Sequence, residues 1–337
     1  MATRTQRILR RERMEQTIKA LIEMFVATKQ TEGRTAKTTE WYRQMITRFA
    51  DYLGAEPTIK DFTIDNARLF IASLQQRETR YPNHPWREEV EGKLSANTVD
   101  GYVRALKAFS SWLAEEGYTR TNILSRLKRP KLPETMIQVL SDEEVQTILE
   151  GINENTLLGA RQYLIVLLLY DTGIRAQELC TLTLDNVDLE ENVIKVMGKG
   201  RKERIVPFGS RTKKYLQRYL TTWRPEPDRE DNNFLFLSPD GSPLTYSNLS
   251  HMIKRLGVNA GIPRLHAHLF RHSFAVRYLM NGGDPMSLKR ILGHTTLDVT
   301  QVYMHLADDH LKVLHRRFSP VDHLALETGR KKRHSAA

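Results

Sequence analysis

The chain of 337 residues is long enough for two average domains, and its hydrophobic content of 40% excludes a mainly disordered chain. Its 51 Lys and Arg against 40 Asp and Glu give a formal net charge of +11, which favours a polyanionic partner such as a nucleic acid. The single cysteine, Cys180, excludes an intramolecular disulfide and a multi-cysteine zinc site. The longest apolar run, 163–170, is far shorter than the roughly 20 residues of a membrane-spanning helix, and no secretory signal is visible. We therefore expect a soluble cytoplasmic protein that associates with the nucleoid and has no membrane partner.

The first segment is expected to be helical. Residues 1–14 are rich in arginine and predict a basic arm. Apolar residues then recur at helical spacing in four stretches, 18–25, 38–53, 64–74 and 95–117. The polar stretch 77–94 contains Pro82 and Pro85 and is long for a connection between helices, which predicts a loop. Together these features predict one helical domain over 15–120.

A basic linker is expected over 121–140, where Pro130 and Pro133 stiffen the chain. Four basic side chains in it are candidate DNA contacts: Arg126, Lys128, Arg129 and Lys131. Such a linker suits a clamp that closes around a polyanion. An ordinary solvent-exposed linker has the same composition, so charge alone does not decide between the two interpretations.

The second domain is expected over 141–326, followed by a basic tail over 327–337. Its predicted elements are, in order, a helix opened by the capping box of Ser141 and Glu144, a buried helix at 161–170, a helix from 175, a β-hairpin of 193–197 and 204–208, a helix at 216–223, a strand at 234–237, and helices from 246 to about 326. The whole chain is thus predicted to be mainly α with a small antiparallel β-sheet.

Two segments of the second domain suit phosphate binding. TGIRAQEL places Arg175 in the first turn of a helix with Glu178 on the same face, where a guanidinium can bind a phosphate through two hydrogen bonds. A local Arg–Glu pair explains the same residues. GKGRKER places Lys199, beside Arg201 and Lys202, between glycines at a hairpin tip, where the chain can approach a ligand closely. A plain basic hairpin tip explains the same residues. The segment lacks the spacing of a P-loop and leads into a strand, which argues against that motif.

Two further segments carry histidines. HLFRHSFA places His268 and Arg271 on one helical face, as proton carrier and charge clamp of a phosphate pocket. A zinc site of His266, His268 and His272 is the alternative, but the acidic residue of an HExxH motif is missing and no cysteine is near. LGHTTLDVTQVYMH places His294 in a turn before Tyr303, which is one of 12 tyrosines and has no intrinsic mark of a nucleophile.

The order of these four segments resembles the tyrosine recombinase/integrase family, of the Xer and phage-integrase kind. The resemblance covers 141–305 and, more loosely, the helices before it. It implies a two-domain, C-shaped clamp on double-stranded DNA. The helical domain of 15–120 then corresponds to the SAM-like core-binding domain of the family, and 141–326 to its catalytic domain.

The resemblance also implies a catalytic set: Arg175, Lys199, His268, Arg271, His294 and Tyr303, with Glu178 in support. The two arginines and His294 bind the scissile phosphate, and Tyr303 attacks it to form a 3′-phosphotyrosyl link. Lys199 protonates the leaving 5′-oxygen, and His268 assists in acid–base steps. The nearby cations make a tyrosine, whose free pKa is near 10, a better nucleophile, so no metal cofactor is required. The covalent link conserves the energy of the phosphodiester, so ATP is not required either.

The implied partners are DNA sites with inverted repeats and a homotetramer on two such sites, and an accessory DNA-bending factor is a candidate. Leu311, Leu314 and Phe318 suit docking on a neighbouring subunit and equally suit internal packing. The long 77–94 loop favours integration or excision of a mobile element over chromosome-dimer resolution. A non-catalytic DNA-binding regulator with this fold and a type IB topoisomerase are the alternatives.

Overall fold

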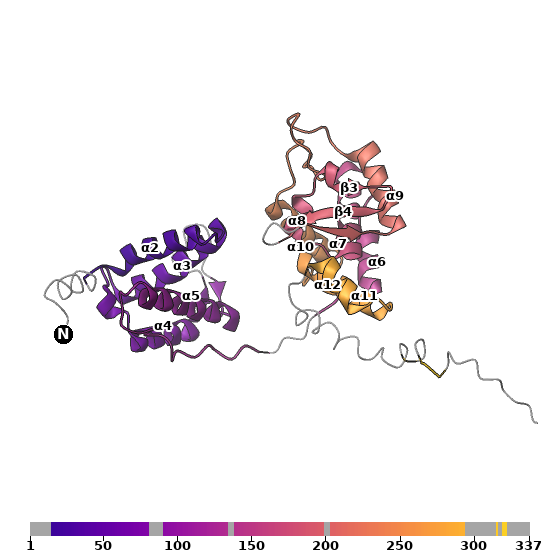
Figure 1. The fold of residues 1–337 in the computed structure, drawn as a ribbon. Helices are drawn as coiled ribbons and strands as arrows, with labels where there is room; N and C mark the ends of the chain where they lie inside the picture. Colours follow the sequence, from indigo (N-terminus) through magenta and orange to yellow (C-terminus); the bar gives the residue numbers. More distant parts are fainter. Residues whose placement is uncertain are drawn as a thin grey trace, which may run out of the picture. The chain divides into compact units, whose positions relative to one another are not determined.

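The computed structural model describes residues 15–80, 90–133, 138–198 and 203–293, together with residue 315 and residues 319–321. Contacts between residues divide the chain near residue 135 into two compact units (Figure 1). No helix within these described ranges is long and apolar enough to cross a lipid bilayer.

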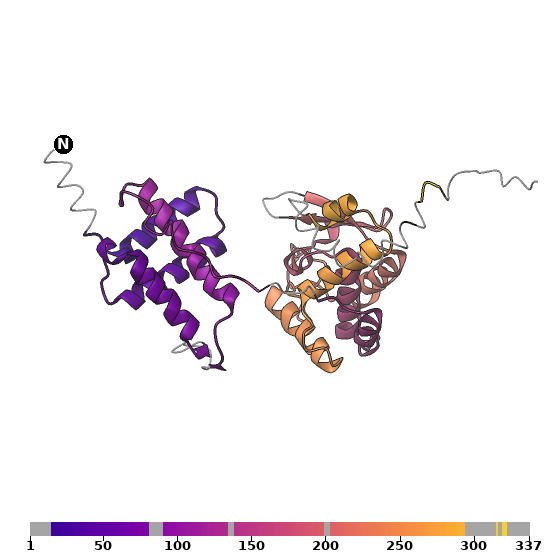
Figure 2. The ribbon, with the colours of Figure 1, turned by 90° about the horizontal axis from the view of Figure 1, so that it is seen from below.

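The first unit is a bundle of helices, seen from two directions in Figure 1 and Figure 2. Its elements in the described residues up to 133 are α2 (Ile18–Thr31), α3 (Ala36–Leu53), the 3-10 turn η1 (Ile59–Asp61), α4 (Ile64–Gln76) and α5 (Ala96–Glu115). Each α-helix begins after a Thr or Ser whose hydroxyl accepts a backbone N–H of the first turn, which satisfies one unpaired donor. The predicted positions of these four helices are confirmed.

The core of the first unit is rich in edge-to-face aromatic pairs. The ring of Phe109 lies 5.4 Å from that of Phe25 and 5.5 Å from that of Phe62. Leu124 and Leu127, which follow α5, are buried in the same core. The ammonium group of Lys107 donates hydrogen bonds to both of their backbone carbonyls, at 3.1 and 2.9 Å. The packed first unit therefore continues beyond residue 120, into the stretch expected to be linker.

The segment expected to be a loop at 77–94 begins and ends in paired backbone. Strands β1 (Thr79–Arg80) and β2 (Val90–Glu91) run antiparallel, with Thr79 opposite Glu91. Pro82 and Pro85 lie outside the described residues. The two ends of the segment are thus held side by side.

The second unit surrounds one buried helix. Its elements in the described ranges from 138 to 293 are α6 (Asp142–Glu150), α7 (Leu157–Thr172), α8 (Ala176–Cys180), the 3-10 turn η2 (Leu184–Asn186), β3 (Val187–Asp188), β4 (Val193–Met197), β5 (Glu203–Pro207), α9 (Ser210–Arg218), the π-helical turn η3 (Tyr219–Trp223), α10 (Tyr246–Asn259), α11 (Ala267–Met280) and α12 (Pro285–Leu292). Most residues of helix α7 are apolar and buried, as expected for a helix that its neighbours enclose. The N–H of Leu140 donates to the buried hydroxyl of Ser273 on α11, so the expected linker ends inside this unit.

The sheet of the second unit is antiparallel, in the order β3-β4-β5. Strands β4 and β5 form the predicted hairpin, with Met197 opposite Glu203. In Figure 1 the sheet occupies the upper part of this unit, and α11 and α12 the lower part. The prediction of a mainly α fold with a small antiparallel sheet is confirmed.

The prediction of a strand at 234–237 is wrong. Only isolated bridges, Thr183 with Phe234 and Leu237 with Pro243, occur there. Arginine side chains take the carbonyls that a neighbouring strand would use: Arg224 donates to the oxygens of residues 234 and 235, and Arg161 to that of Leu237. The alternative donors explain why an apolar, β-prone segment does not extend the sheet.

Candidate active site

The turn between α7 and α8 positions Arg175. Gly173 ends α7 with a left-handed φ of 61°, and a Cβ there would lie 2.4 Å from the Phe274 ring, so the turn requires glycine. Arg175 then caps α8 in an extended conformation. Its backbone N–H donates to Glu178 Oε2 at 2.9 Å, and its Nη1 donates to Oε1 at 2.8 Å. The Arg–Glu pair predicted from TGIRAQEL is therefore present, with the guanidinium still 36% exposed and the carboxylate 5%.

A second arginine, absent from the sequence-based set, completes this carboxylate site. Arg204 on β5 donates from Nη1 and Nη2 to the two oxygens of Glu178, both at 2.8 Å. Its Nε donates to the carbonyl of Ile291 near the end of α12, at 2.6 Å. A Cβ on Gly293 would lie only 3.1 Å from Arg204, so glycine makes this approach possible. Arg204 thus joins β5, α8 and the end of α12.

The two arginines determine the charge state of Glu178. Burial acts to raise the pKa of its carboxyl group, but the hydrogen bonds from Arg204 and from the Arg175 backbone outweigh it and hold the pKa below its usual value. Glu178 is therefore a permanent anion at neutral pH. The Glu178 carboxylate orients the guanidinium groups of Arg175 and Arg204. The exposed part of the Arg175 guanidinium stays available to a ligand.

Arg271 is the most deeply buried of the expected catalytic side chains that the structure describes. It lies on α11, is 2% exposed, and donates to the carbonyls of Gly173 and Leu292, both at 2.7 Å. One of these acceptors precedes Arg175 by a short turn, and the other ends α12 before His294. Arg271 thus holds the turn before Arg175 at a fixed distance from the end of α12.

The histidines of α11 favour the neutral form. The rings of His268 and His272 lie edge to face, with centroids 4.6 Å apart. Although His268 remains accessible to solvent, partial burial of its imidazole, helped by the charge of Arg271, lowers its pKa. Burial lowers the pKa of His272 to about 4. A neutral, accessible imidazole beside Arg271 suits a proton acceptor.

The histidines considered for zinc lie on α11 and directly before it. His266 precedes α11, and its Nδ1 hydrogen-bonds with the carbonyl of Arg264 at 2.8 Å. Within the ranges that the structure describes, no group of three or more His, Cys, Asp or Glu side chains is arranged to hold a metal ion. The lone Cys180 is buried, which raises the pKa of its thiol to about 11 and makes it a poor ligand at neutral pH.

Several expected residues lie outside the described part of the chain: Lys199, Arg201, Lys202, His294, Tyr303, Leu311, Leu314 and Phe318. These residues belong to two segments, 199–202 and the chain from 294 onward. The described residues that border the first segment are Gly198 and Glu203, and the one that precedes the second is Gly293. Arg204 follows directly after Glu203 and touches Gly293. The described residues that flank the two segments, Arg204 after the first and Gly293 before the second, therefore lie side by side.

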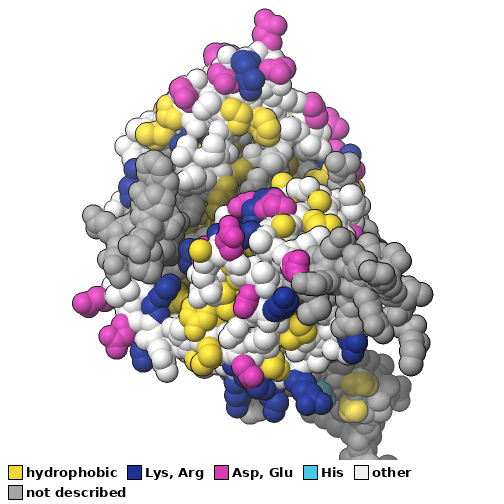
Figure 3. All heavy atoms as spheres, turned by 90° about the vertical axis from the view of Figure 1, so that its left-hand side faces the viewer, with side chains coloured by type: hydrophobic (Ala, Val, Ile, Leu, Met, Phe, Trp, Pro, Cys, Tyr) yellow, Lys and Arg dark blue, Asp and Glu magenta, His cyan; other side chains and the backbone are white. Residues whose placement is uncertain are grey.

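The four candidate DNA-binding residues that follow α5 are all exposed, namely Arg126, Lys128, Arg129 and Lys131. They differ in one respect. Arg129 donates from Nε and Nη2 to the two carboxylate oxygens of Asp100 on α5, at 2.7 and 2.8 Å, and these hydrogen bonds lower the pKa of Asp100. On the face drawn in Figure 3, Lys and Arg side chains are interspersed with Asp and Glu. Net charge alone therefore does not delimit a DNA-binding surface.

Known proteins resemble this chain over nearly its whole length. The family model of the phage integrase family matches residues 138–310. A tyrosine recombinase XerC of Oceanobacillus iheyensis is 33% identical over 306 residues, which are 89% of this chain and 95% of that protein. A tyrosine recombinase XerD of Listeria monocytogenes is 31% identical over 294 residues, 86% of this chain and 94% of that protein.

Solved structures agree in fold. The Tn1549 transposon integrase in complex with a circular intermediate DNA superposes with a TM-score of 0.69 at 20% identity, covering 89% of this chain and 99% of that one. The XerH recombinase bound to a palindromic difH substrate gives 0.65 at 22% identity, covering 90% and 85%. The chain belongs to the phage integrase family, whose members are tyrosine recombinases that cleave and rejoin DNA.

Proposed function

We propose that this protein recombines DNA at specific sites through a covalent 3′-phosphotyrosyl intermediate. The observation that carries the proposal is the cluster in which Glu178 aligns Arg175 and Arg204 while Arg271 ties together the segments on either side. Such a preorganised set of cations suits the negative charge that develops on a phosphate during transfer. The duplex itself supplies the energy, because the covalent link conserves that of the phosphodiester.

The proposed reaction places the nucleophile at Tyr303. Its phenolic oxygen attacks the scissile phosphorus, the bond from phosphorus to the 5′-oxygen breaks, and Lys199 donates a proton to that oxygen. Arg175, Arg271 and His294 bind the non-bridging oxygens. His268 exchanges a proton near the nucleophile, a role that its lowered pKa supports. The reverse reaction, with a 5′-hydroxyl from another strand, rejoins the DNA.

We assign Glu178 and Arg204 a positioning role. Neither needs to touch the phosphate. Glu178 orients the exposed guanidinium of Arg175, and Arg204 holds the base of the hairpin that carries Lys199 against the end of α12. The spacing between the start of α8, the base of the hairpin and the end of α12 then depends on one buried ion-pair network.

The role of Lys199 can be tested with a chemically modified substrate. A duplex whose scissile 5′-oxygen is replaced by sulfur has a leaving group that needs no proton. We expect Lys199→Ala to cleave ordinary DNA at least about 100-fold more slowly than the parent, and to recover most of that loss on the sulfur-containing duplex. Arg175→Ala is the control, because its loss affects the phosphate oxygens and should not be recovered. A deficit of Lys199→Ala that persists on the modified duplex would assign the proton to another group.

The biological setting has two candidates. Similarity to recombinases named XerC and XerD over 94–95% of their lengths supports a Xer-type role, such as resolution of chromosome dimers. The long segment at 77–94, with its paired β1 and β2 ends, supports integration or excision of a mobile element. We propose the second role as the finer interpretation, with double-stranded DNA carrying inverted-repeat sites as the partner.

A plasmid assay separates these functions. Plasmids carrying two copies of a candidate site, taken from the DNA flanking the gene or from chromosomal sites, are incubated with the protein. Exchange between gene-flanking sites supports a mobile element, and exchange only between chromosomal sites supports the Xer-type role. Relaxation of a plasmid without any site would favour a topoisomerase, and binding without strand exchange a regulator.

The assembly and the role of each domain also belong to the proposal. The unit before residue 135 takes the core-binding role and the later unit the catalytic role, with 1–14 as a basic arm and 327–337 as a tail. A homotetramer holds two DNA sites, assisted by an accessory DNA-bending factor. Light scattering of the protein with a duplex that carries one inverted-repeat site tests the tetramer, which predicts four chains per two duplexes.

A further inference from the structure

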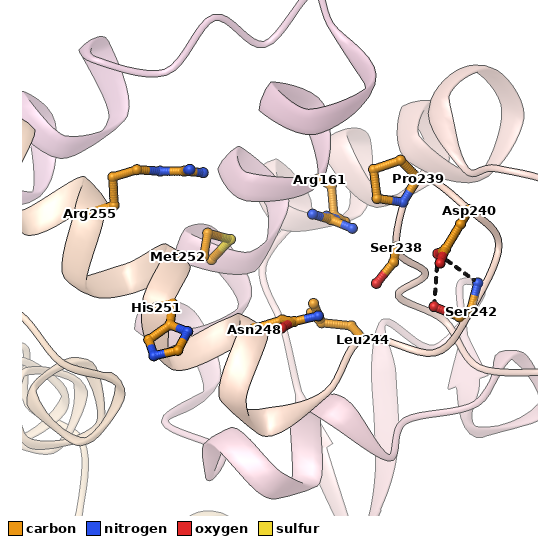
Figure 4. Close-up of a pocket in the computed structure, with 10 residues that line it drawn as sticks. All are labelled: Arg161, Ser238, Pro239, Asp240, Ser242, Leu244, Asn248, His251, Met252 and Arg255. Carbon is orange, nitrogen blue, oxygen red and sulfur yellow. Dashed lines mark hydrogen bonds between the residues drawn. The ribbon is translucent and has the colours of Figure 1, made fainter. Parts of the chain in front are cut away.

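A cavity of about 550 Å³ lies beside α10 and is lined by none of the residues of the candidate active site. Its lining comes from Arg161 of α7, the loop around Ser238 and one face of α10 (Figure 4). Arg161 and Gly173 occupy opposite ends of α7, separated by roughly 18 Å at the rise of an α-helix. The cavity is therefore distinct from the cluster around Arg175.

Arg161 is the central feature of this cavity. It is 7% exposed, and its Nη1 donates to the carbonyl of Leu237. Its Nε is buried and has no hydrogen-bond partner, and no carboxylate of the described residues lies within ion-pair distance. Burial lowers the pKa of Arg161, yet a guanidinium stays charged in proteins. A buried cation without a counter-ion is costly, and binding an anion would offset that cost.

The facing side of α10 supplies further donors. Asn248, His251 and Arg255 follow one another at helical spacing and line the cavity. Figure 4 shows the guanidinium groups of Arg161 and Arg255 directed into the space between α10 and the loop at 238–244. Ser238 adds a hydroxyl from that loop. The lining thus offers two fork-shaped cations with an imidazole, an amide and a hydroxyl.

One acidic residue shares the lining. Asp240 accepts hydrogen bonds from the backbone N–H and the hydroxyl of Ser242, at 3.2 and 2.8 Å, and these lower the pKa of its carboxyl group. Its carboxylate is thereby bound to its own loop, as Figure 4 shows. The remaining charge of the lining is positive.

We propose that this cavity binds a phosphate group. Guanidinium groups pair with the oxygens of a phosphate through two parallel hydrogen bonds, and hydroxyl and amide donors complete the shell of a tetrahedral anion. The phosphate belongs either to the DNA backbone or to a free phosphate compound. This inference goes beyond the recombination chemistry, because none of its residues takes part in that reaction.

The test uses inorganic phosphate and the free protein without DNA. The imidazole C–H signal of His251, assigned with His251→Asn, is followed by NMR while phosphate replaces chloride at constant ionic strength. We expect a saturable shift of this signal. Arg255→Gln, an exposed substitution that leaves the core intact, should weaken the apparent affinity at least about tenfold, the effect of losing one charged hydrogen bond. Lys254→Gln, the neighbouring exposed residue, is the matched control and should retain the response.

The outcomes are separable from those of the proposed recombination. A His251 signal that ignores phosphate, or that responds equally in Arg255→Gln, overturns the proposal even where DNA cleavage proceeds. The same titration on Tyr303→Phe tests the cavity in a variant that cannot cleave DNA.

To identify the source of the phosphate, DNA affinity is measured as a function of salt concentration. If the phosphate is that of DNA, Arg255→Gln should reduce the logarithmic salt slope by about one unit more than Lys254→Gln does. An unchanged slope with loss of the phosphate response indicates a free phosphate compound.

Discussion

Arg204 of β5 and Glu178 of α8 share two parallel hydrogen bonds of 2.8 Å each. The two side chains are 11% and 5% exposed, so the pair is shielded from water and salt. Because Glu178 also accepts two hydrogen bonds from Arg175, one carboxylate links the base of the hairpin to the start of α8. DNA cleavage should therefore depend on the fork-shaped geometry of the Arg204 guanidinium.

Arg204→Lys should impair DNA cleavage although it retains the charge. A lysine lacks the planar fork, so it cannot hold both oxygens of Glu178 and the carbonyl of Ile291 together. We expect formation of the covalent DNA adduct to slow at least about tenfold, and the free energy of unfolding to fall by about 1–3 kcal/mol. Stopped-time gel assays and urea unfolding measure the two effects.

A double-substitution cycle checks the cause. Glu178→Gln combined with Arg204→Lys should cost less than the sum of the single changes, with a coupling energy of about 0.5–3 kcal/mol. Lys214→Ala, at an exposed lysine on α9, is the control for loss of a positive charge elsewhere in the second unit. Additive effects of the two changes would contradict a direct interaction.

Arg271→Lys should lower the stability of the second unit. The guanidinium of Arg271 is 2% exposed and donates to carbonyls on two different segments, and an ammonium group cannot reach both with the same geometry. We expect a loss of about 1–3 kcal/mol in the free energy of unfolding, measured by urea titration. Arg277→Lys, on the same helix but 30% exposed, should cost under about 1 kcal/mol. Similar losses for both variants would be inconsistent with this account.

Stability should decrease on mild acidification because of His272. The unfolded chain takes up a proton on this imidazole near its ordinary pKa of 6.5, whereas burial delays uptake in the folded protein to about pH 4. The unfolded state thus binds more protons between these values, so the free energy of unfolding falls as the pH drops through this window. Because the ring is only partly buried, we expect a loss on the order of 1–2 kcal/mol between pH 7 and pH 5.

The comparison of His272→Gln with the parent isolates this contribution. Urea midpoints at pH 7 and pH 5 should differ less in the variant than in the parent, while His315→Gln, at an exposed histidine outside α11, should behave as the parent does. Equal pH dependence in all three proteins would show that His272 does not carry the effect.

The basic residues after α5 should fall into two groups. Arg129 is paired with Asp100 through two hydrogen bonds, whereas Lys128 has no such partner among the described residues. We expect Arg129→Gln to lower the thermal stability of the protein, and Lys128→Gln to leave it unchanged while weakening DNA binding in proportion to one lost phosphate contact. Thermal unfolding and salt-dependent binding measure both. Loss of stability in Lys128→Gln, or none in Arg129→Gln, would contradict the assignment.

Elements whose ends depend on residues close together in the sequence could be predicted from the sequence. Ser141 and Glu144 form the expected capping box, with the N–H of Glu144 donating to the Ser141 hydroxyl at 3.2 Å. The pair of Arg175 and Glu178 was visible for the same reason, because a helical turn brings residues at that spacing together. The hairpin of β4 and β5 followed from its alternation and glycines.

Contacts between distant elements could not be predicted in this way. Arg204 meets Glu178 and Ile291, which lie on α8 and α12, and no spacing rule relates these positions. One signal was available: Arg204 and the buried Val206 share a face of β5, so an inward-facing charge was to be expected. Likewise, Leu124 and Leu127 were the apolar residues that marked the expected linker as part of a core.

The most direct test of the account is covalent trapping of the protein on DNA. The protein is incubated with labelled duplexes from the DNA flanking its gene, including a nicked version from which the cleaved strand diffuses away, and then denatured. The account predicts a denaturation-resistant protein–DNA band that is absent in Tyr303→Phe and present in Tyr52→Phe, an exposed tyrosine of the first unit. A band that persists in Tyr303→Phe would place the nucleophile elsewhere. The absence of any band on DNA that the protein binds tightly would contradict the phosphotyrosyl reaction itself.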